Sequence, residues 1–148
     1  MSEPNQIVIR GSKDEDWPKI LDLYNSLSQD DLEFRFMNLH YLTIDEAKQI
    51  SELNNRTTYL ALKDEAVIGE AALEEDGEIS IVVSKAFRAE GVGISLLTQL
   101  IEVAKLKGMK KVKFFCLPSN LQMAWLGAFL GFKLLNHFGM EDEWVLDI

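Results

Sequence analysis

The apolar positions of this chain recur at helical spacing in some stretches and form strand-like runs in others. Spacings of three and four residues within 17–27, 44–53, 91–107 and 119–131 predict four amphipathic helices. The residues that we expect on their inner faces are Trp17, Ile20, Leu21, Tyr24 and Leu27, then Ile44, Ala47, Ile50 and Leu53, then Leu97, Leu100, Ile101 and Ala104, and finally Leu121, Ala124, Trp125, Ala128 and Phe129.

Polar residues at the ends of these stretches predict where the helices begin. Asp14 as an N-cap would place Pro18 in the first turn, where its missing N–H costs little. The segments "TIDE" (43–46) and "SNLQ" (119–122) have the spacing of a capping box. The segment "SQDDLEFRFMNLHYL" lacks a clean period, and we expect a short or bent helix around 30–38 within it.

Shorter apolar runs between the helices predict a sheet of about seven strands. The runs are 7–10, 57–63, 66–73, 78–84, 110–117, 132–138 and 143–148. Short turns favour antiparallel hairpins, whereas the helix between 78–84 and 110–117 makes those two strands parallel neighbours. The sequence therefore predicts one α/β domain over 1–148, with a mixed, mostly antiparallel central sheet and helices on both faces.

Composition and charge narrow the class of protein. A formal net charge of −9 over 148 residues argues against a direct nucleic-acid binder and is compatible with a cationic partner. It also fits plain solubility. There is one cysteine, no apolar run long enough for a membrane span, and no basic and then apolar leader at the N-terminus. We therefore expect a cytoplasmic protein with no membrane association. We expect a monomer, although the terminal strands could also leave a sheet edge for a partner.

The segment "FRAEGVG" (87–93) raises the question of a phosphate site. Its two glycines lie between a predicted strand and the start of a predicted helix, where backbone N–H groups lack partners and the helix dipole favours anions. Residue 96 is Leu, so the dinucleotide fingerprint is absent, and no Gly-Lys-Ser/Thr follows. By itself the pattern fits an ordinary turn or a phosphate-binding loop.

The wider context of these glycines resembles motif A of the GNAT superfamily of N-acetyltransferases, Arg/Gln-x-x-Gly-x-Gly/Ala. It is present as Arg88-Ala89-Glu90-Gly91-Val92-Gly93, and Asn120 with Gly131-Phe132 is similar to the family's later pattern. The segment "YNSLSQDDLEFRF" (24–36) is similar to Pat-type protein lysine acetyltransferases, including the small archaeal form. The resemblance implies a GNAT-like sheet in which strands 78–83 and 110–116 splay apart to form an acyl-CoA cleft.

This resemblance also implies which residues hold acetyl-CoA. The pyrophosphate would lie on the amides of residues 88–93, and the pantetheine arm would pair with the strand. Ser95 and Asn120 would add polar contacts, or would only cap their helices. The implied set is Ile81, Val82, Val83, Arg88, Ala89, Glu90, Gly91, Val92, Gly93, Ser95 and Asn120, and no metal is expected.

The implied reaction is attack of a neutral amine on a thioester. A lysine ammonium has a pKa of about 10.4, so a base must take its proton, directly or through water. The resemblance assigns this role to Glu78. Glu74, at the end of the adjoining strand, is the second candidate base, and Asp45 is a candidate for binding the cationic substrate. An amide of Val82 or Val83 would stabilise the oxyanion. From the residues alone, Glu78 also fits a solvated position after an Asp-Gly turn, and Asp45 fits a first helical turn.

One family residue is missing and the acceptor stays open. Many GNAT enzymes carry a general-acid tyrosine where this chain has Gly127; solvent could protonate the thiolate instead. We expect transfer to a lysine of a basic protein, such as a chromatin-like protein. The alternatives are a small amine or a protein N-terminus as acceptor, or an acyl-CoA binding module without catalysis.

Overall fold

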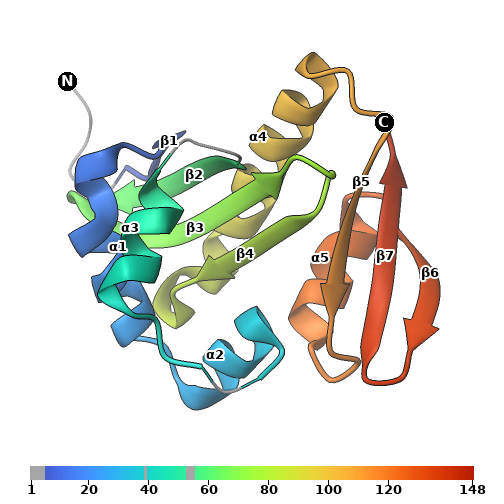
Figure 1. Cartoon of the computed structure of the whole chain (residues 1–148), viewed down its shortest axis with the longest axis horizontal. Coiled ribbons are helices and arrows are strands. Elements are labelled where there is room, and N and C mark those ends of the chain that lie inside the picture. Colours follow the sequence, from blue (N-terminus) through green and yellow to red (C-terminus); the bar gives the residue numbers. More distant parts are fainter. Residues whose placement is uncertain (1–5, 39, 53–55) are drawn as a thin grey trace.

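Seven strands form two sheets in the part of the chain that the structure describes. This computed structural model describes residues 6–38, 40–52 and 56–148. The first sheet has the order β1 (Val8–Gly11), β2 (Arg56–Lys63), β3 (Ala66–Glu74) and β4 (Ile79–Val83), all antiparallel. The second has the order β5 (Lys111–Cys116), β7 (Glu141–Asp147) and β6 (Lys133–Phe138), also antiparallel. Figure 1 shows the two sheets side by side, with β4 and β5 facing each other.

A single parallel bridge, Glu78 to Lys113, joins the two sheets. There the amide of Lys113 donates to the carbonyl of Gly77 at 3.0 Å. The mixed α/β class and the parallel relation of these strands are confirmed, but one continuous central sheet is not what forms. Beyond the bridge β4 and β5 diverge: among the described residues no further pairing joins them, and Leu126 packs near Ile81 and the first turn of α4 on this side of β4. This divergence makes room for a cavity.

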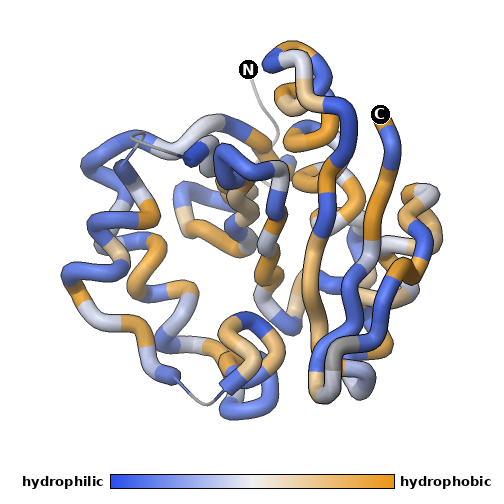
Figure 2. The backbone as a smooth tube through the Cα atoms, turned by 45° about the vertical axis from the view of Figure 1, so that its right-hand side comes forward, coloured by the Kyte–Doolittle hydropathy of each residue, from blue (hydrophilic) through white to orange (hydrophobic). Residues whose placement is uncertain are grey.

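Helices cover both faces of the first sheet. The helices are α1 (Trp17–Asn25), α2 (Gln29–Phe36), α3 (Ile44–Ser51), α4 (Val92–Leu106) and α5 (Leu121–Phe129), with 3₁₀ turns at η1 (Asp14–Asp16) and η2 (Lys85–Glu90). Of these, α5 packs on the second sheet, where Gly127 lies against Phe114. One core lies under α1 and α3, and a larger one joins α4 to both sheets. Figure 2 shows hydrophobic residues along the strands and α4. Within the described ranges, no helix has the length and apolar character needed to cross a bilayer.

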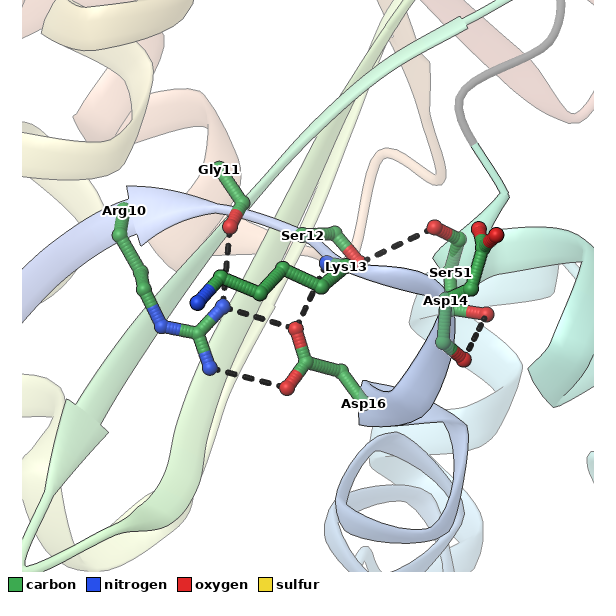
Figure 3. Close-up of polar contacts among 7 residues, drawn as sticks. All are labelled: Arg10, Gly11, Ser12, Lys13, Asp14, Asp16 and Ser51. Carbon is green, nitrogen blue, oxygen red and sulfur yellow. Dashed lines mark hydrogen bonds and ion pairs between the residues drawn. The ribbon is translucent and has the colours of Figure 1, made fainter.

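The chain enters α1 differently from the prediction. Asp14 begins the 3₁₀ turn instead of capping α1, and Pro18 lies in the first turn as expected. Asp16, which is buried, accepts hydrogen bonds from both terminal nitrogens of Arg10 at 2.8 and 2.9 Å, and from the amide of Lys13 at 2.7 Å (Figure 3). The hydrogen bonds from Arg10 lower the pKa of Asp16 below its ordinary value. This cluster fixes the start of α1 against β1.

The two helices that follow form close to where the pattern predicts them. Ser28 caps α2, and its hydroxyl accepts from the amide of Asp31 at 3.1 Å. Thr43 and Glu46 form the predicted capping box of α3. Ile44 was expected to be buried but is 52% exposed, because it lies at the outer edge of the first turn. Leu53, predicted on the same face, lies outside the described residues.

The last helix turns the opposite face inward from the one predicted. Leu121, Trp125 and Phe129 are 74%, 60% and 60% exposed. The other side, with Met123, Leu126 and the buried Gly127, packs on the larger core. Because α5 is apolar on almost every side, spacing alone could not select the buried face. Asn120, and not Ser119, is its N-cap; its Oδ1 accepts from the amide of Met123 at 3.2 Å.

Candidate active site

A cavity of about 620 Å³ opens where β4 and β5 diverge. Its walls come from α2, β4, η2 and the first turns of α4 and α5. The volume is typical of small-molecule sites, which span about 300–1,000 Å³. Eight of the residues predicted to hold acetyl-CoA line it: Ile81, Val82, Val83, Arg88, Ala89, Gly91, Gly93 and Asn120. The four-stranded half and the C-terminal half of the chain thus share one site.

The two positions of the predicted phosphate loop need glycine for different structural reasons. Gly91 precedes α4 with a φ of 76°, a left-handed conformation that side-chain-bearing residues adopt at a cost. A Cβ at Gly93 would lie 3.2 Å from Leu126 Cδ2, so glycine allows α5 to approach the loop. The helix ladder starts with the amide of Ser95 bonded to the carbonyl of Gly91 at 3.1 Å. The amides before it have no helical partner and favour an anion.

The strand β4 offers alternate backbone groups to the cavity. The amide of Ser84 bonds to the carbonyl of Ile68 on β3 at 2.7 Å. Amide and carbonyl of one residue in an antiparallel ladder point to the same side and alternate along the strand. Val82 therefore directs both groups toward β3, whereas Ile81 and Val83 direct theirs toward the cavity. This corrects the expectation that Val82 could supply an oxyanion amide or pair with the pantetheine arm through its backbone.

Arg88, in the predicted phosphate loop, contacts the opposite wall of the cavity. Its Nε donates to the carbonyl of Val83 at 3.1 Å, and its Nη2 lies 2.6 Å from Oδ1 of Asp31 on α2. Both Arg88 and Asp31 line the cavity. The guanidinium is thus held across the cavity between β4 and α2, where the carboxylate of Asp31 offsets its charge.

A buried polar cluster supports the same wall from behind and was missed in the sequence. Glu70 on β3 is fully buried and accepts a hydrogen bond from the hydroxyl of Tyr24. Arg35 Nε donates to that hydroxyl at 3.0 Å, and Arg35 Nη2 lies 3.8 Å from Glu70 Oε1. Burial would lower the pKa of Arg35, but Tyr24 and Glu70 raise it above its ordinary value. The signal in the sequence was a lone glutamate within the apolar run 66–73.

Glu78 lies at the bridge where the strands begin to separate. Its carboxylate has no hydrogen-bond or ion-pair partner among the described residues. Burial raises the pKa of Glu78 above its ordinary value; Asp76 adds to the rise, and Lys113 opposes it. Glu74, directly across from it on β3, is held in an ion pair by Arg56, with Arg56 Nε at 3.0 Å from Oε1. Of the two, Glu78 is the one free to accept a proton.

Six predicted site residues are absent from the cavity lining, and the candidate bases Glu78 and Glu74 are two of them. Glu90 and Ser95 are exposed, the side chain of Val92 is in the core, and Asp45 is exposed on the first turn of α3. Their predicted roles stay predictions. Asn120 both caps α5 and lines the cavity, so its two interpretations are compatible.

The structure explains why position 127 carries no side chain. A Cβ at Gly127 would lie 2.5 Å from Cζ of Phe114, whose ring packs between Phe132 and Trp144. The space that a tyrosine would need is filled by this aromatic group. The only cysteine, Cys116, is buried, and burial raises the pKa of its thiol to about 11, so it is a core residue and a poor nucleophile. Among the described residues, no group of three or more His, Cys, Asp or Glu side chains could hold a metal ion.

Comparisons with known proteins agree with this geometry. The GNAT domain of S. lividans PAT is 18% identical with a TM-score of 0.87, covering 95% of this chain and 89% of that one. The PaiA N-acetyltransferase of Thermoplasma acidophilum, solved with coenzyme A, is 15% identical with a TM-score of 0.80, covering 97% and 99%. YncA of Salmonella typhimurium, solved with its cofactor acetyl-CoA, is 23% identical with a TM-score of 0.77, covering 97% and 94%.

At these identities the solved structures establish the fold. The acetyltransferase (GNAT) family itself matches residues 17–132, which is most of the chain. Taken with the cavity, this match shows that the chain belongs to the GNAT family of N-acetyltransferases, which take their acetyl group from acetyl-CoA.

Proposed function

We propose that this enzyme transfers the acetyl group of acetyl-CoA directly to the side-chain amine of a protein lysine, with Glu78 as general base through a water molecule. The observation that carries the proposal is the position of Glu78. It lies at the Lys113 bridge, where the strands begin to separate, on the chain just before Ile81 of the cavity lining, with a raised pKa and no competing partner among the described residues. A carboxylate with a raised pKa is a stronger base, and thus better matched to proton removal near neutral pH.

The surroundings of Glu78 favour a cationic acceptor. The turn "EEDGE" (74–78) carries four carboxylates; Arg56 pairs with Glu74 and Lys113 lies 3.7 Å from Asp76, which leaves Glu75 and Glu78 unpaired among the described residues. These charges raise the local concentration of a lysine side chain and lower the barrier to its approach. The likeness of segment 24–36 to Pat-type enzymes and the TM-score of 0.87 to the GNAT domain of S. lividans PAT support a protein acceptor.

The cavity fits the co-substrate in its chemistry. The free amides before Ser95 suit a pyrophosphate, and the outward-facing groups of Ile81 and Val83 suit the amides of a pantetheine arm. The carbonyl of Val83 already accepts from Arg88, so its amide is the group left for a ligand oxygen. With Gly127 in place of tyrosine, the thiolate takes its proton from solvent. A thiol pKa of about 8.5 makes that step feasible.

The test uses isotope-labelled acetyl-CoA, the purified enzyme and an extract of the source cells separated by size. Label on lysines of a few basic proteins, lost with Glu78→Gln, is the expected result. Glu74→Gln is the matched control and should keep most of the activity, because Arg56 already engages that carboxylate.

The other outcomes separate the alternatives. Label only on small molecules, or only on protein N-termini, would replace the lysine acceptor. Binding of acetyl-CoA without any transfer would indicate a binding module. Full activity in Glu78→Gln would remove Glu78 from the base role.

A further inference from the structure

An aromatic pair stands exposed at the edge of the cavity. Trp125 and Phe129, one turn apart on α5, are each 60% exposed, and their rings stack at 5.3 Å between centroids with a 20° tilt. Trp125 also lines the cavity, whereas the inner side of α5 meets the core. Phe129 covers one face of the indole and restricts its motion, so the other face is preorganised for a flat partner.

The position of Trp125 relative to the phosphate loop is fixed by packing. Leu126, the next residue, contacts the first turn of α4, since its Cδ2 lies 3.2 Å from where a Cβ would be at Gly93. The indole is therefore within a few side-chain lengths of the free amides of that turn. It lies on the α5 side of the loop, opposite the wall formed by Arg35 and α2.

The chemistry of acetyl-CoA supplies one flat group for this place. The thioester end must reach toward Glu78, and the pantetheine arm follows Ile81 and Val83 to the loop. With the pyrophosphate on the amides, the adenosine is the part that continues out of the cavity. Adenine is the only aromatic ring system of acetyl-CoA. A base can stack on an exposed indole without hydrogen bonds to its edge.

We propose that Trp125 is the platform on which the adenine ring of acetyl-CoA stacks. This rests on the proposed function, because it takes the pyrophosphate to lie on the loop before α4. Trp125 does not touch the reacting atoms: it sets the affinity and the pose of the co-substrate's distal end. The ligand group that stacks on Trp125 is the adenine base. Because Trp125 lines the cavity, its exposed indole is part of the co-substrate site and not a separate apolar surface patch.

The experiment compares two co-substrates on two variants. Acetyl-CoA and S-acetyl-4′-phosphopantetheine, which lacks the adenosine, are titrated calorimetrically against the wild type, Trp125→Ala and Trp125→Phe. We expect Trp125→Ala to weaken acetyl-CoA binding roughly tenfold and to leave the truncated thioester unchanged. Trp125→Phe should restore most of the affinity. Leu106→Ala, at an 88% exposed apolar residue at the end of α4, is the matched control and should change neither.

Kinetics separates failure of this proposal from failure of the proposed function. Trp125→Ala should raise the KM for acetyl-CoA and keep kcat, whereas Glu78→Gln should lower kcat and keep acetyl-CoA binding. An equal loss for both thioesters in Trp125→Ala would overturn the adenine platform, because the indole would then serve the arm or the fold. Unchanged binding of both would overturn it as well and would point to a macromolecule on this face.

Discussion

The two walls of the cavity are built on different physical principles. The wall of the four-stranded half holds charge: Tyr24, Arg35 and Glu70 form a buried cluster, and Asp31 pairs with Arg88. The wall of the C-terminal half is held by aromatic packing around Phe114 and Gly127, with Trp125 at its edge. The glycine loop of residues 88–93, predicted to bind phosphate, lies between them.

This difference fits a division of labour in acyl transfer. Charged groups keep fixed positions when burial and hydrogen bonds hold them. Once fixed, they determine where the charged groups of a substrate can bind. An apolar wall instead excludes water and bounds the thioester arm. The charged wall should thus be the more sensitive to loss of one partner, and the packed wall to changes of volume.

The largest stability effect should come from the buried carboxylate. Glu70→Ala leaves Arg35 in the interior without its counter-charge, and we expect a loss of about 3–5 kcal/mol in the free energy of unfolding. Urea denaturation measures it. Glu75→Ala, at an exposed carboxylate near the end of the same strand, should stay within about 0.5 kcal/mol. Equal effects from the two variants would mean that the charged wall has no structural role.

A change of volume tests the packed wall. Gly127→Tyr forces a side chain against Phe114 and should cost about 1–3 kcal/mol of stability. Phe114→Leu in the same chain should recover part of this loss, as thermal unfolding can show. If Gly127→Tyr is neutral by itself and raises kcat, the aromatic wall is looser than its packing indicates, and the missing general acid can be supplied.

The loop between the walls should respond to backbone strain. Gly91→Ala puts a side chain at a φ of 76° and should cost about 1–2 kcal/mol. Because residue 91 precedes the free amides of α4, the affinity of Gly91→Ala for acetyl-CoA should fall too, which calorimetry would detect. Gly108→Ala, at a similar φ of 78° beyond the end of α4, should cost similar stability and leave the affinity unchanged. If Gly91→Ala and Gly108→Ala bind acetyl-CoA equally well, the loop has no role in co-substrate binding.

The smallest effect should be at the ion pair across the cavity. Asp31→Asn removes the partner of Arg88 from a partly exposed pair, so we expect about 0.2–1 kcal/mol of lost stability. Arg88 would then be free to face a pyrophosphate. We therefore expect Asp31→Asn to bind acetyl-CoA slightly more tightly than the wild type does, with a larger gain at low salt than at high salt. A weaker co-substrate affinity would mean that the pair positions the guanidinium.

Local patterns predict much of the fold and the loop. Capping at Thr43, the stripe of α4 and the glycines 91 and 93 are short-range features, and each is where the sequence indicates. The motif spacing identified the family because it carries chemistry within a few residues. These predictions did not depend on how distant segments meet.

What the sequence did not reveal depends on such meetings. Whether Trp125 or Leu126 faces the core is decided by the sheet that α5 contacts, since both sides of the helix are apolar. The pairing of Tyr24 with Glu70 spans 46 residues. The division into two sheets, joined by the single bridge from Glu78 to Lys113, depends on how distant segments meet, which no strand pattern contains.

The central claim is that Glu78 is the base, and the pH dependence of kcat/KM tests it most directly. A lysine acceptor loses reactivity as pH falls because its amine is protonated, in both wild type and Glu78→Gln. In the wild type the decline should steepen below the raised pKa of Glu78, where the base itself takes up a proton.

Glu78→Gln should react roughly 10²- to 10⁴-fold more slowly and show no steepening. Its stability near neutral pH should be equal or slightly higher. A carboxyl whose folded pKa is raised loses stability as pH climbs from its unfolded pKa to its folded pKa, and glutamine avoids that loss. With the lysine acceptor, the predicted result is a slow Glu78→Gln enzyme whose kcat/KM shows a single shallow decline as pH falls. A Glu78→Gln enzyme with the wild-type rate and the same steepening would contradict the account.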